Sequence, residues 1–206
     1  MGRITVAAGC NGAGKSTLLA PFIRAAGGAY YDPDRYAQAL RAAGLDARHA
    51  NVAAWHRGFA ALTAAIDGDS DFVFETTLGG QRITAELLRA LARGRQVVIL
   101  YVGLDSADLH VRRVAERVAR GGHDIPEALI RSRYDASRRN LLRFVGTAAT
   151  LRVWDNSAQS PDGTPRARLL LDIRAGRLHL PAGSEIAVLP AWIRPLAAAA
   201  LAAEAR

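Results

Sequence analysis

The order of apolar and polar segments along this 206-residue chain predicts an α/β fold with a mostly parallel sheet covered by helices on both faces. Strand-like and helix-like stretches alternate through most of the chain, as they do in parallel sheets. The first apolar run, Arg3 to Ala8, leads directly into a glycine-rich turn. The run Val97 to Leu104 (VVILYVGL) is apolar at nearly every position, which is typical of a central parallel strand buried on both faces.

Hydrophobic periodicity and turn residues give the order of the elements. We expect strands at residues 3–8, 29–31, 71–75, 97–104 and 150–154. Helices are expected at residues 16–26, 35–43, 51–66, 81–92, 106–120 and 126–145. Pro21 lies inside the first of these helices, where it removes a backbone hydrogen bond and favours a kink.

The last part of the chain has a different character. Residues 159–165 form a polar connector that contains proline and glycine. Residues 169–173 and 177–180 resemble a hairpin that turns at Ala175-Gly176, and an Ala-rich helix at residues 195–205 ends the chain. We therefore expect a core at residues 1–158, and at residues 159–206 a hairpin and helix packed on the same domain.

The net charge of +8 does not by itself indicate nucleic-acid binding. The arginines are spread along the chain and few aromatic residues stand among them, so we expect no platform for stacking bases. The single cysteine excludes a disulfide framework and fits a reducing compartment. No apolar run reaches the length of a membrane span, and the first strand begins directly after Met1. We expect a cytoplasmic protein that binds neither nucleic acid nor a membrane.

A complete phosphate-binding loop, G-x-x-x-x-G-K-[ST], follows the first strand. It contains Lys15, the single lysine of the chain, whose compact charge suits the β- and γ-phosphates of a nucleotide better than a guanidinium does. The Ser16 hydroxyl is placed to bind Mg²⁺. The pattern predicts that ATP and Mg²⁺ bind here. The residues expected to contact the nucleotide are Gly9, Asn11, Gly12, Ala13, Gly14, Lys15, Ser16 and Thr17.

Polar residues follow the next two strands at their carboxyl ends, where ligands collect in open α/β sheets. Asp32 and Asp34 flank a proline after the second strand, so that Asp34 can face the phosphates while either carboxylate can cap the following helix. Glu75 ends the third strand, where many phosphate-loop proteins place a carboxylate near Mg²⁺. The hydroxyls of Thr76 and Thr77 come next, and they suit a polyhydroxylated acceptor.

A stripe of arginines lies on one face of the helix expected at residues 106–120, and more arginines follow on the next helix. Such a stripe is usually a solvated helix face, but this one runs into Gly121-Gly122, which can act as a hinge. We expect residues 112–134 to form a lid whose arginines neutralise charge on a transferred phosphoryl group and which excludes water. The arginines concerned are Arg113, Arg117, Arg120, Arg131 and Arg133.

Taken together, these elements resemble the zeta-toxin-like family of phosphate-loop kinases. The resemblance covers roughly residues 3–157 and rests on the segments GCNGAGKST (9–17), DPD (32–34), FETTL (74–78), RVAERVARGGHDIPEALIRSR (113–133) and DNS (155–157). The best-understood members transfer the γ-phosphoryl group of ATP to a hydroxyl of UDP-N-acetylglucosamine. The resemblance therefore implies an ATP-dependent kinase with a sugar nucleotide as acceptor and a small antitoxin protein as a candidate partner.

The resemblance also implies a role for each matching residue. Lys15 and Ser16 hold the phosphates and Mg²⁺, and Asp34 matches the base that accepts the proton of the sugar hydroxyl. The catalytic residues implied are Lys15, Asp34, Arg117 and Arg120, the two arginines acting as phosphate clamps. The substrate-binding residues implied are Asp34, Glu75, Thr76, Thr77, Arg82, Arg131 and Arg133.

The chain departs from the family at two places near the acceptor. Gly79-Gly80-Gln81-Arg82 stands where the family branch often has Ser-Gly-Arg, which shifts the arginine to Arg82. The helix expected at residues 51–66 contains no carboxylate, although well-studied members use a glutamate there to hold the sugar. Two other functions stay open: a kinase for a nucleoside, an RNA end or another sugar, and an ATP-binding switch or partner-binding module without a small-molecule acceptor.

Overall fold

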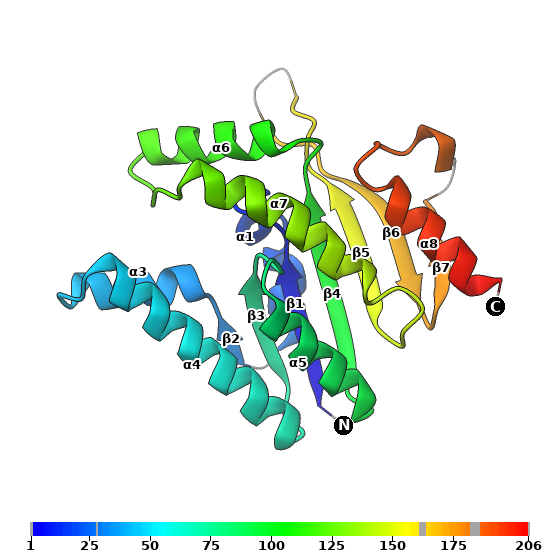
Figure 1. Ribbon diagram of the computed structural model, residues 1–206, viewed down its shortest axis with the longest axis horizontal. Helices are drawn as coiled ribbons and strands as arrows, with labels where there is room; N and C mark the ends of the chain where they lie inside the picture. Colours follow the sequence, from blue (N-terminus) through cyan, green and yellow to red (C-terminus); the bar gives the residue numbers. More distant parts are fainter. Residues whose placement is uncertain (1, 28, 161–163, 182–185, 206) are drawn as a thin grey trace.

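A computed structural model of the chain describes residues 2–27, 29–160, 164–181 and 186–205. Its centre is a seven-stranded sheet in the order β2-β3-β1-β4-β5-β6-β7 (Figure 1). The strands are β1 (Arg3–Ala8), β2 (Ala29–Tyr31), β3 (Phe72–Thr76), β4 (Gln96–Gly103), β5 (Thr150–Asp155), β6 (Arg168–Arg174) and β7 (Arg177–His179). Strands β1 to β5 pair in parallel, and β6 and β7 continue the sheet antiparallel. The predicted mostly parallel sheet is confirmed, with residues 97–103 of the apolar run in β4 at its centre.

Helices cover both faces of this sheet, as predicted, but unequally. They are α1 (Lys15–Leu18), α2 (Ala20–Ala26), α3 (Pro33–Ala42), α4 (Ala47–Asp67), α5 (Gln81–Ala92), α6 (Ala107–Ala119), α7 (Glu127–Leu142) and α8 (Arg194–Glu204), with a 3₁₀ turn at Ile186–Val188. The larger core joins the sheet to α4, α5, α7 and α8 through residues such as Leu62, Leu87, Leu141 and Leu196. In the parts of the chain that the structure describes, no helix combines the length and the apolar character needed to cross a membrane.

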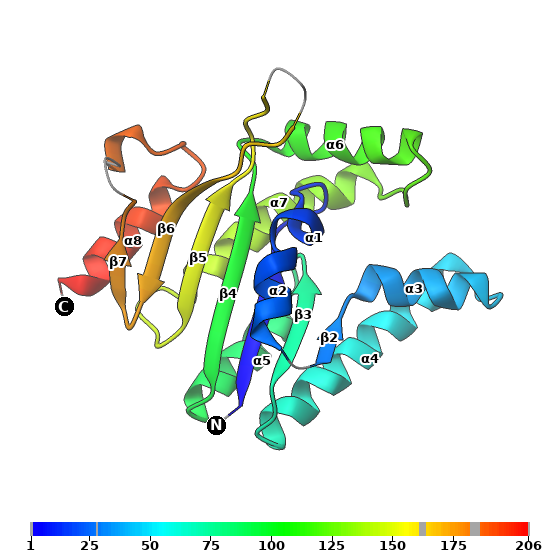
Figure 2. The same ribbon diagram turned by 180° about the vertical axis from the view of Figure 1, so that it is seen from behind.

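The other face of the sheet is covered only near its centre by α1 and α2, and Figure 2 shows β5, β6 and β7 without a helix in front of them. A small core lies under α2, where Phe22 packs against Trp154 with their ring centroids 5.2 Å apart. Arg152 and Asp172 alternate with the core residues of β5 and β6, and they form an ion pair of 3.3 Å. Because no helix covers these strands on this side, they carry charged side chains where a central strand carries apolar ones.

Several helix boundaries differ from those predicted, and α7 ends at Leu142 where residue 145 was expected. The helix expected at residues 16–26 is interrupted at Leu19, two residues before Pro21, where a kink was expected. It therefore forms two short helices, and Pro21 lies in the first turn of the second. Helix α3 begins two residues earlier than expected, because Asp32 caps it. Helix α4 begins at Ala47 because the Asp46 carboxylate accepts hydrogen bonds from two backbone N–H groups of its first turn.

The carboxyl-terminal part adds to the main core. The predicted hairpin is confirmed, and its turn has φ values of +49° at Ala175 and +75° at Gly176, as a tight two-residue turn between twisted strands requires. Leu171 and Leu196 bury their side chains in the same core as β1 and β4. Of the predicted connector at residues 159–165, the segment 161–163 lies outside the described residues.

We predict that Gly103→Ala destabilises the fold by about 1–3 kcal/mol, because added side-chain atoms overpack a filled core. A Cβ at Gly103, the last residue of β4, would lie 2.3 Å from Cη2 of Trp192. Urea denaturation measures the change in the free energy of unfolding. Gly80→Ala is the matched control, since a Cβ at Gly80 meets no heavy atom within 4 Å. Equal stability of the two variants would show that Trp192 does not pack against β4.

Candidate active site

The ends of the parallel strands bring the predicted site residues to one edge of the sheet. Strand β1 lies between β3 and β4, and its last residue, Ala8, pairs with Thr76 on one side and Tyr101 on the other. The phosphate-binding loop therefore opens between the ends of two neighbouring strands, where open α/β sheets bind their ligands.

The loop adopts a backbone conformation that favours glycine. Gly14 has a φ of +88°, and a Cβ there would lie 2.6 Å from Nδ2 of Asn156. The Asn156 amide donates a hydrogen bond to the carbonyl of Ala13 at 2.9 Å, and Nδ1 of His110 lies 2.7 Å from the carbonyl oxygen of Asn11. Both contacts use carbonyl oxygens, so they fix the loop without using the N–H groups that a phosphate needs.

The Glu75 carboxylate, at the end of β3, contacts three polar side chains. Nζ of Lys15 lies 3.5 Å from Oε1, the Ser16 hydroxyl donates to Oε2 at 3.1 Å, and the Tyr30 hydroxyl donates to Oε2 at 3.3 Å. The side chains of Lys15 and Glu75 are only 7% and 11% exposed, so water screens their attraction weakly. Burial and the charge of Glu75 raise the pKa of Tyr30, which keeps its hydroxyl a donor.

The residues around Ser16 fit Mg²⁺. The Ser16 hydroxyl and the Glu75 carboxylate offer the hard oxygen ligands that this ion prefers. Among the residues that the structure describes, no group of three or more His, Cys, Asp and Glu side chains could hold a metal ion by itself. Water and the phosphate oxygens of a nucleotide are the further ligands that a magnesium ion at Ser16 would take.

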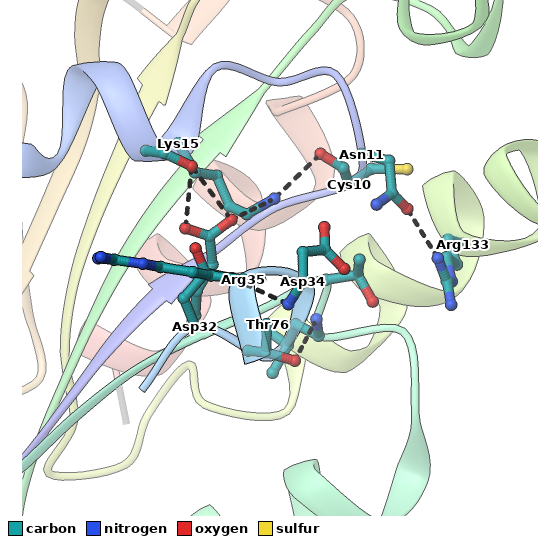
Figure 3. Close-up of polar contacts among 12 residues, drawn as sticks. Cys10, Asn11, Lys15, Asp32, Asp34, Arg35, Thr76 and Arg133 are labelled. Carbon is teal, nitrogen blue, oxygen red and sulfur yellow. Dashed lines mark hydrogen bonds and ion pairs between the residues drawn. The ribbon is translucent and has the colours of Figure 1, made fainter. Parts of the chain in front are cut away.

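Asp32 and Asp34 have different surroundings at the start of α3. The Asp32 carboxylate accepts hydrogen bonds from the N–H groups of Asp34 and Arg35, and burial raises its pKa. The Asp34 side chain faces a cavity, between Lys15 and Arg133 in Figure 3. Within the described residues it forms no hydrogen bond or ion pair, which leaves its oxygens available to a ligand.

Among the predicted arginines, Arg133 lines this cavity. Its Nη1 donates to Oδ1 of Asn11 in the phosphate-binding loop at 2.9 Å (Figure 3). Burial lowers its pKa, while the nearby carboxylate of Asp34 acts in the opposite direction. Arg133 is thus a cation held against the phosphate-binding loop, and it lines the same cavity as Asp34.

The other predicted arginines lie elsewhere. Arg131 forms ion pairs with Asp108 at 2.6 Å and with Glu127 at 2.8 Å, outside the residues that line the cavity. Arg82 stacks on the ring of Trp55, with 5.5 Å from its Cζ to the ring centroid.

Arg117 and Arg120 lie at the end of α6. Arg117 donates through Nη2 to the carbonyl of His123 at 2.6 Å, and Arg120 is exposed. Gly121 has a φ of +85°. The backbone N–H groups of Gly121 and Gly122 donate hydrogen bonds to carbonyl oxygens in the last turn of α6, which is the usual glycine-based end of a helix. That these glycines act as a hinge stays a prediction.

A cavity of about 550 Å³ joins the end of the sheet to α3, α4, α5 and α7. Its polar end holds Asn11, Lys15, Asp34, Glu75, Thr76, Thr77 and Arg133. The Thr76 and Thr77 hydroxyls accept hydrogen bonds from the N–H groups of Leu78 and Gly79. Each hydroxyl hydrogen is left to donate to a ligand in the cavity.

The far wall of the cavity is aromatic, and the sequence analysis missed it. Trp55 and Phe59 on α4 line it, and their rings stack with centroids 5.2 Å apart. Asn51 precedes Trp55 by one helical turn and lines the same cavity. The i, i+4 spacing of these three residues could have revealed the wall from the sequence, since residues at this spacing share one face of a helix.

The fold and the loop define a phosphate-loop protein with the kinase architecture. The chain belongs to the zeta toxin family, whose model, described as "Zeta toxin", matches residues 3–160. An uncharacterized protein of Haemophilus influenzae (strain ATCC 51907 / DSM 11121 / KW20 / Rd) is 31% identical over 126 residues, which are 61% of this chain and 88% of that protein.

Solved structures share the fold at low sequence identity. A chain of the AvrRxo1-ORF1:AvrRxo1-ORF2 complex with sulphate ions matches with a TM-score of 0.62 at 16% identity, covering 88% of this chain and 61% of that one. The same complex with ATP also gives a TM-score of 0.62, at 15% identity, over 87% of this chain and 60% of that one. The present chain thus spans about 61% of the length of this structural relative.

We predict that His110 makes the fold less stable in acid. Its side chain is 1% exposed, and burial lowers its pKa from 6.5 to about 4. Below pH 6.5 the unfolded chain binds a proton that the folded chain does not, so stability falls as the pH drops from about 6.5 to about 4, by up to about 3 kcal/mol.

Urea denaturation at pH 7 and pH 5 measures this dependence. His110→Gln removes the titrating group and is expected to show a smaller loss of stability between the two pH values. His179→Gln, in the exposed strand β7, is the control and should behave as the unmodified protein does. A loss as large in His110→Gln as in the unmodified protein would assign the acid sensitivity to other groups.

Proposed function

We propose that this protein transfers the γ-phosphoryl group of ATP to a hydroxyl of a small molecule bound in the cavity of about 550 Å³. The observation that carries the proposal is the Asp34 carboxylate, which has no hydrogen bond or ion pair among the described residues and faces the same cavity as Lys15 and Arg133. Membership of the zeta toxin family and the ATP named for the AvrRxo1 complex support it.

In this proposal Asp34 is the general base. It accepts the proton of the acceptor hydroxyl while that oxygen forms a bond to the γ-phosphorus, and the bond from phosphorus to the β–γ bridging oxygen breaks to release ADP. Lys15 and Arg133 neutralise the charge that spreads over the transferred group. Mg²⁺, held by Ser16 with Glu75 nearby, would supply further neutralisation of the β- and γ-phosphates.

Arg117 and Arg120 take part in the proposed reaction when residues 112–134 close over the site as a lid. Both lie next to Gly121-Gly122, and closure would carry their guanidinium groups toward the phosphates. Residues 1–158 are proposed as the kinase core, and residues 159–206 as a packed extension, because the family match ends at residue 160.

The reacting part of the acceptor is proposed to be a sugar-like ring. Asp34 and Glu75 accept hydrogen bonds, and the Thr76 and Thr77 hydroxyls can donate them, which suits several hydroxyl groups on one ring. The sugar part of UDP-N-acetylglucosamine, the acceptor that the resemblance implies, would meet these groups.

A protein partner is proposed on separate grounds. The AvrRxo1-ORF1 relative is named in a complex with AvrRxo1-ORF2, so a small antitoxin-like protein is the partner to look for beside this chain.

Asp34→Asn is predicted to bind ATP normally and to lose phosphoryl transfer by about 10²–10⁴-fold, because an amide cannot accept the proton. Isothermal titration with a non-hydrolysable ATP analogue and Mg²⁺ measures binding, and mass spectrometry of a panel of sugars, sugar nucleotides and nucleosides measures transfer. Asp108→Asn is the control, since that carboxylate is 77% exposed on α6 and away from the cavity.

Full transfer by Asp34→Asn would remove Asp34 from the mechanism. ATP binding by the unmodified protein without any phosphorylated product would favour a nucleotide-dependent switch instead.

A further inference from the structure

A second cavity, of about 250 Å³, is lined by one side of α7 and by residues 192–196, which lead into α8. Its described lining residues are all different from those of the larger cavity at the candidate active site. Residues 192–196 lie beyond the family match, which ends at residue 160. The second cavity is therefore formed where the carboxyl-terminal extension packs on α7, and it is smaller than the roughly 300–1,000 Å³ of sites for drug-sized ligands.

Two different faces of helix α7 line the two cavities. Leu129 and Arg133, one turn apart, line the cavity of the candidate active site. Asp135, Arg139 and Leu142 line the second cavity. Because residues spaced by three or four share one face of a helix, these two sets lie on separate faces. A ligand in the second cavity would thus leave the ATP and acceptor positions free.

Most of the wall of the second cavity is apolar. Leu141, Ile193 and Leu196 line it and are only 1%, 1% and 4% exposed, and all three belong to the main core. The Trp192 indole lies against β4, since a Cβ at Gly103 would meet three atoms of its six-membered ring. An apolar wall of this kind favours a ligand that removes apolar surface from water.

One hydrogen-bond donor at this wall has no acceptor. Trp192 lines the cavity and is 7% exposed, and its buried Nε1 has no hydrogen-bond partner among the residues that the structure describes. Indole Nε1–H can only donate, and a buried donor without an acceptor is both costly and rare in folded proteins. An acceptor atom of a bound ligand would satisfy it.

The α7 side of the second cavity carries one arginine that is engaged and one that is available. Arg138 forms an ion pair with Asp135 at 2.6 Å, and its guanidinium lies over the Tyr134 ring, 3.8 Å from the centroid. The guanidinium of Arg139 forms no hydrogen bond or ion pair within the described part of the chain. A carboxylate is the partner that a guanidinium binds best, through two parallel hydrogen bonds.

We propose that the second cavity binds a small monocarboxylate with an apolar body. The carboxylate would pair with Arg139 and accept a hydrogen bond from Nε1 of Trp192, and the apolar body would lie against Leu142 and Ile193. A cationic ligand fits less well, because the carboxylate that lines this cavity, Asp135, is already paired with Arg138. This inference does not depend on the proposed kinase activity.

The test follows the indole N–H signals of the full chain by ¹H–¹⁵N NMR. The chain has three tryptophans, and the signal of Trp192 is the one lost in Trp192→Phe. Trp55→Phe and Trp154→Phe assign the other two signals, which identifies the third even when Trp192→Phe does not fold. The probes are phenylacetate and 4-methylpentanoate, and their amides are the neutral counterparts.

At least one carboxylate probe is expected to shift the Trp192 signal saturably and to leave the Trp55 and Trp154 signals in place. It is expected to bind about tenfold more tightly than its amide, because the amide lacks the charge that pairs with Arg139. Trp192→Phe, checked for folding by urea denaturation, keeps an aromatic ring without the donor and is expected to weaken carboxylate binding about threefold.

Arg139→Gln assigns the preference for a carboxylate to this arginine. The variant is expected to weaken binding of the carboxylate by about five- to tenfold and to leave the affinities for the amide and for a non-hydrolysable ATP analogue unchanged. Arg143→Gln is the matched control. It removes the same charge one turn further along, from a side chain that donates to Gln81 at 3.0 Å and lies outside the residues that line the cavity.

Four results would overturn the proposal. These are no saturable shift of the Trp192 signal with either carboxylate, equal affinity for a carboxylate and its amide, an equal loss of affinity in Arg139→Gln and Arg143→Gln, and a shift of the Trp55 signal in place of the Trp192 signal. The last result would place the probes in the cavity of the candidate active site. None of the four bears on the kinase proposal, which the Asp34→Asn experiment tests separately.

Discussion

The contact of the Glu75 carboxylate with Lys15 and Ser16 is the interaction on which the site depends. It joins the end of β3 to the phosphate-binding loop that follows β1, and Tyr30 of β2 donates to the same carboxylate. Three neighbouring strands thus meet at one largely buried carboxylate, whose side chain is 11% exposed. In the proposed reaction, the phosphates of ATP would compete with the Glu75 carboxylate for the charge of Lys15.

The surroundings of this contact divide into a polar end and an apolar end. The strand ends supply Asp34, Thr76 and Thr77, which suit hydroxyl chemistry, and α7 brings Arg133 onto the loop. Helix α4 supplies the aromatic wall. Residues after 160 lie outside the family match, yet Leu171 and Leu196 share the main core, which links the added hairpin and α8 to the sheet that carries the site.

The sequence predicted those features that depend on local pattern. Apolar runs located the strands, glycine spacing located the phosphate-binding loop, and Ala175-Gly176 located the hairpin turn. Features that tertiary contacts determine were not predicted from the sequence. Arg131 has the same local context as Arg133, and only the packing of α6 on α7 turns it toward Asp108.

The aromatic wall of the cavity and the first residues of the helices were not predicted, for related reasons. Trp55 and Phe59 have a helical spacing that fits a buried core face as well as a cavity wall, and the position of α4 against α7 and α5 decides between the two. Asp46 starts α4 early because a cap depends on one side-chain rotamer, which periodicity does not report.

The most direct test of this account is the Mg²⁺ dependence of ATP-analogue binding in Glu75→Gln, measured by isothermal titration. The analogue without metal is expected to bind several-fold more tightly to the variant, because a negative charge beside Lys15 has been removed, and the gain in affinity on adding Mg²⁺ is expected to become smaller. Glu116→Gln, on the exposed face of α6, is the control and should leave both affinities unchanged. The same affinity without metal and the same gain from Mg²⁺ in Glu75→Gln and the unmodified protein would contradict the account.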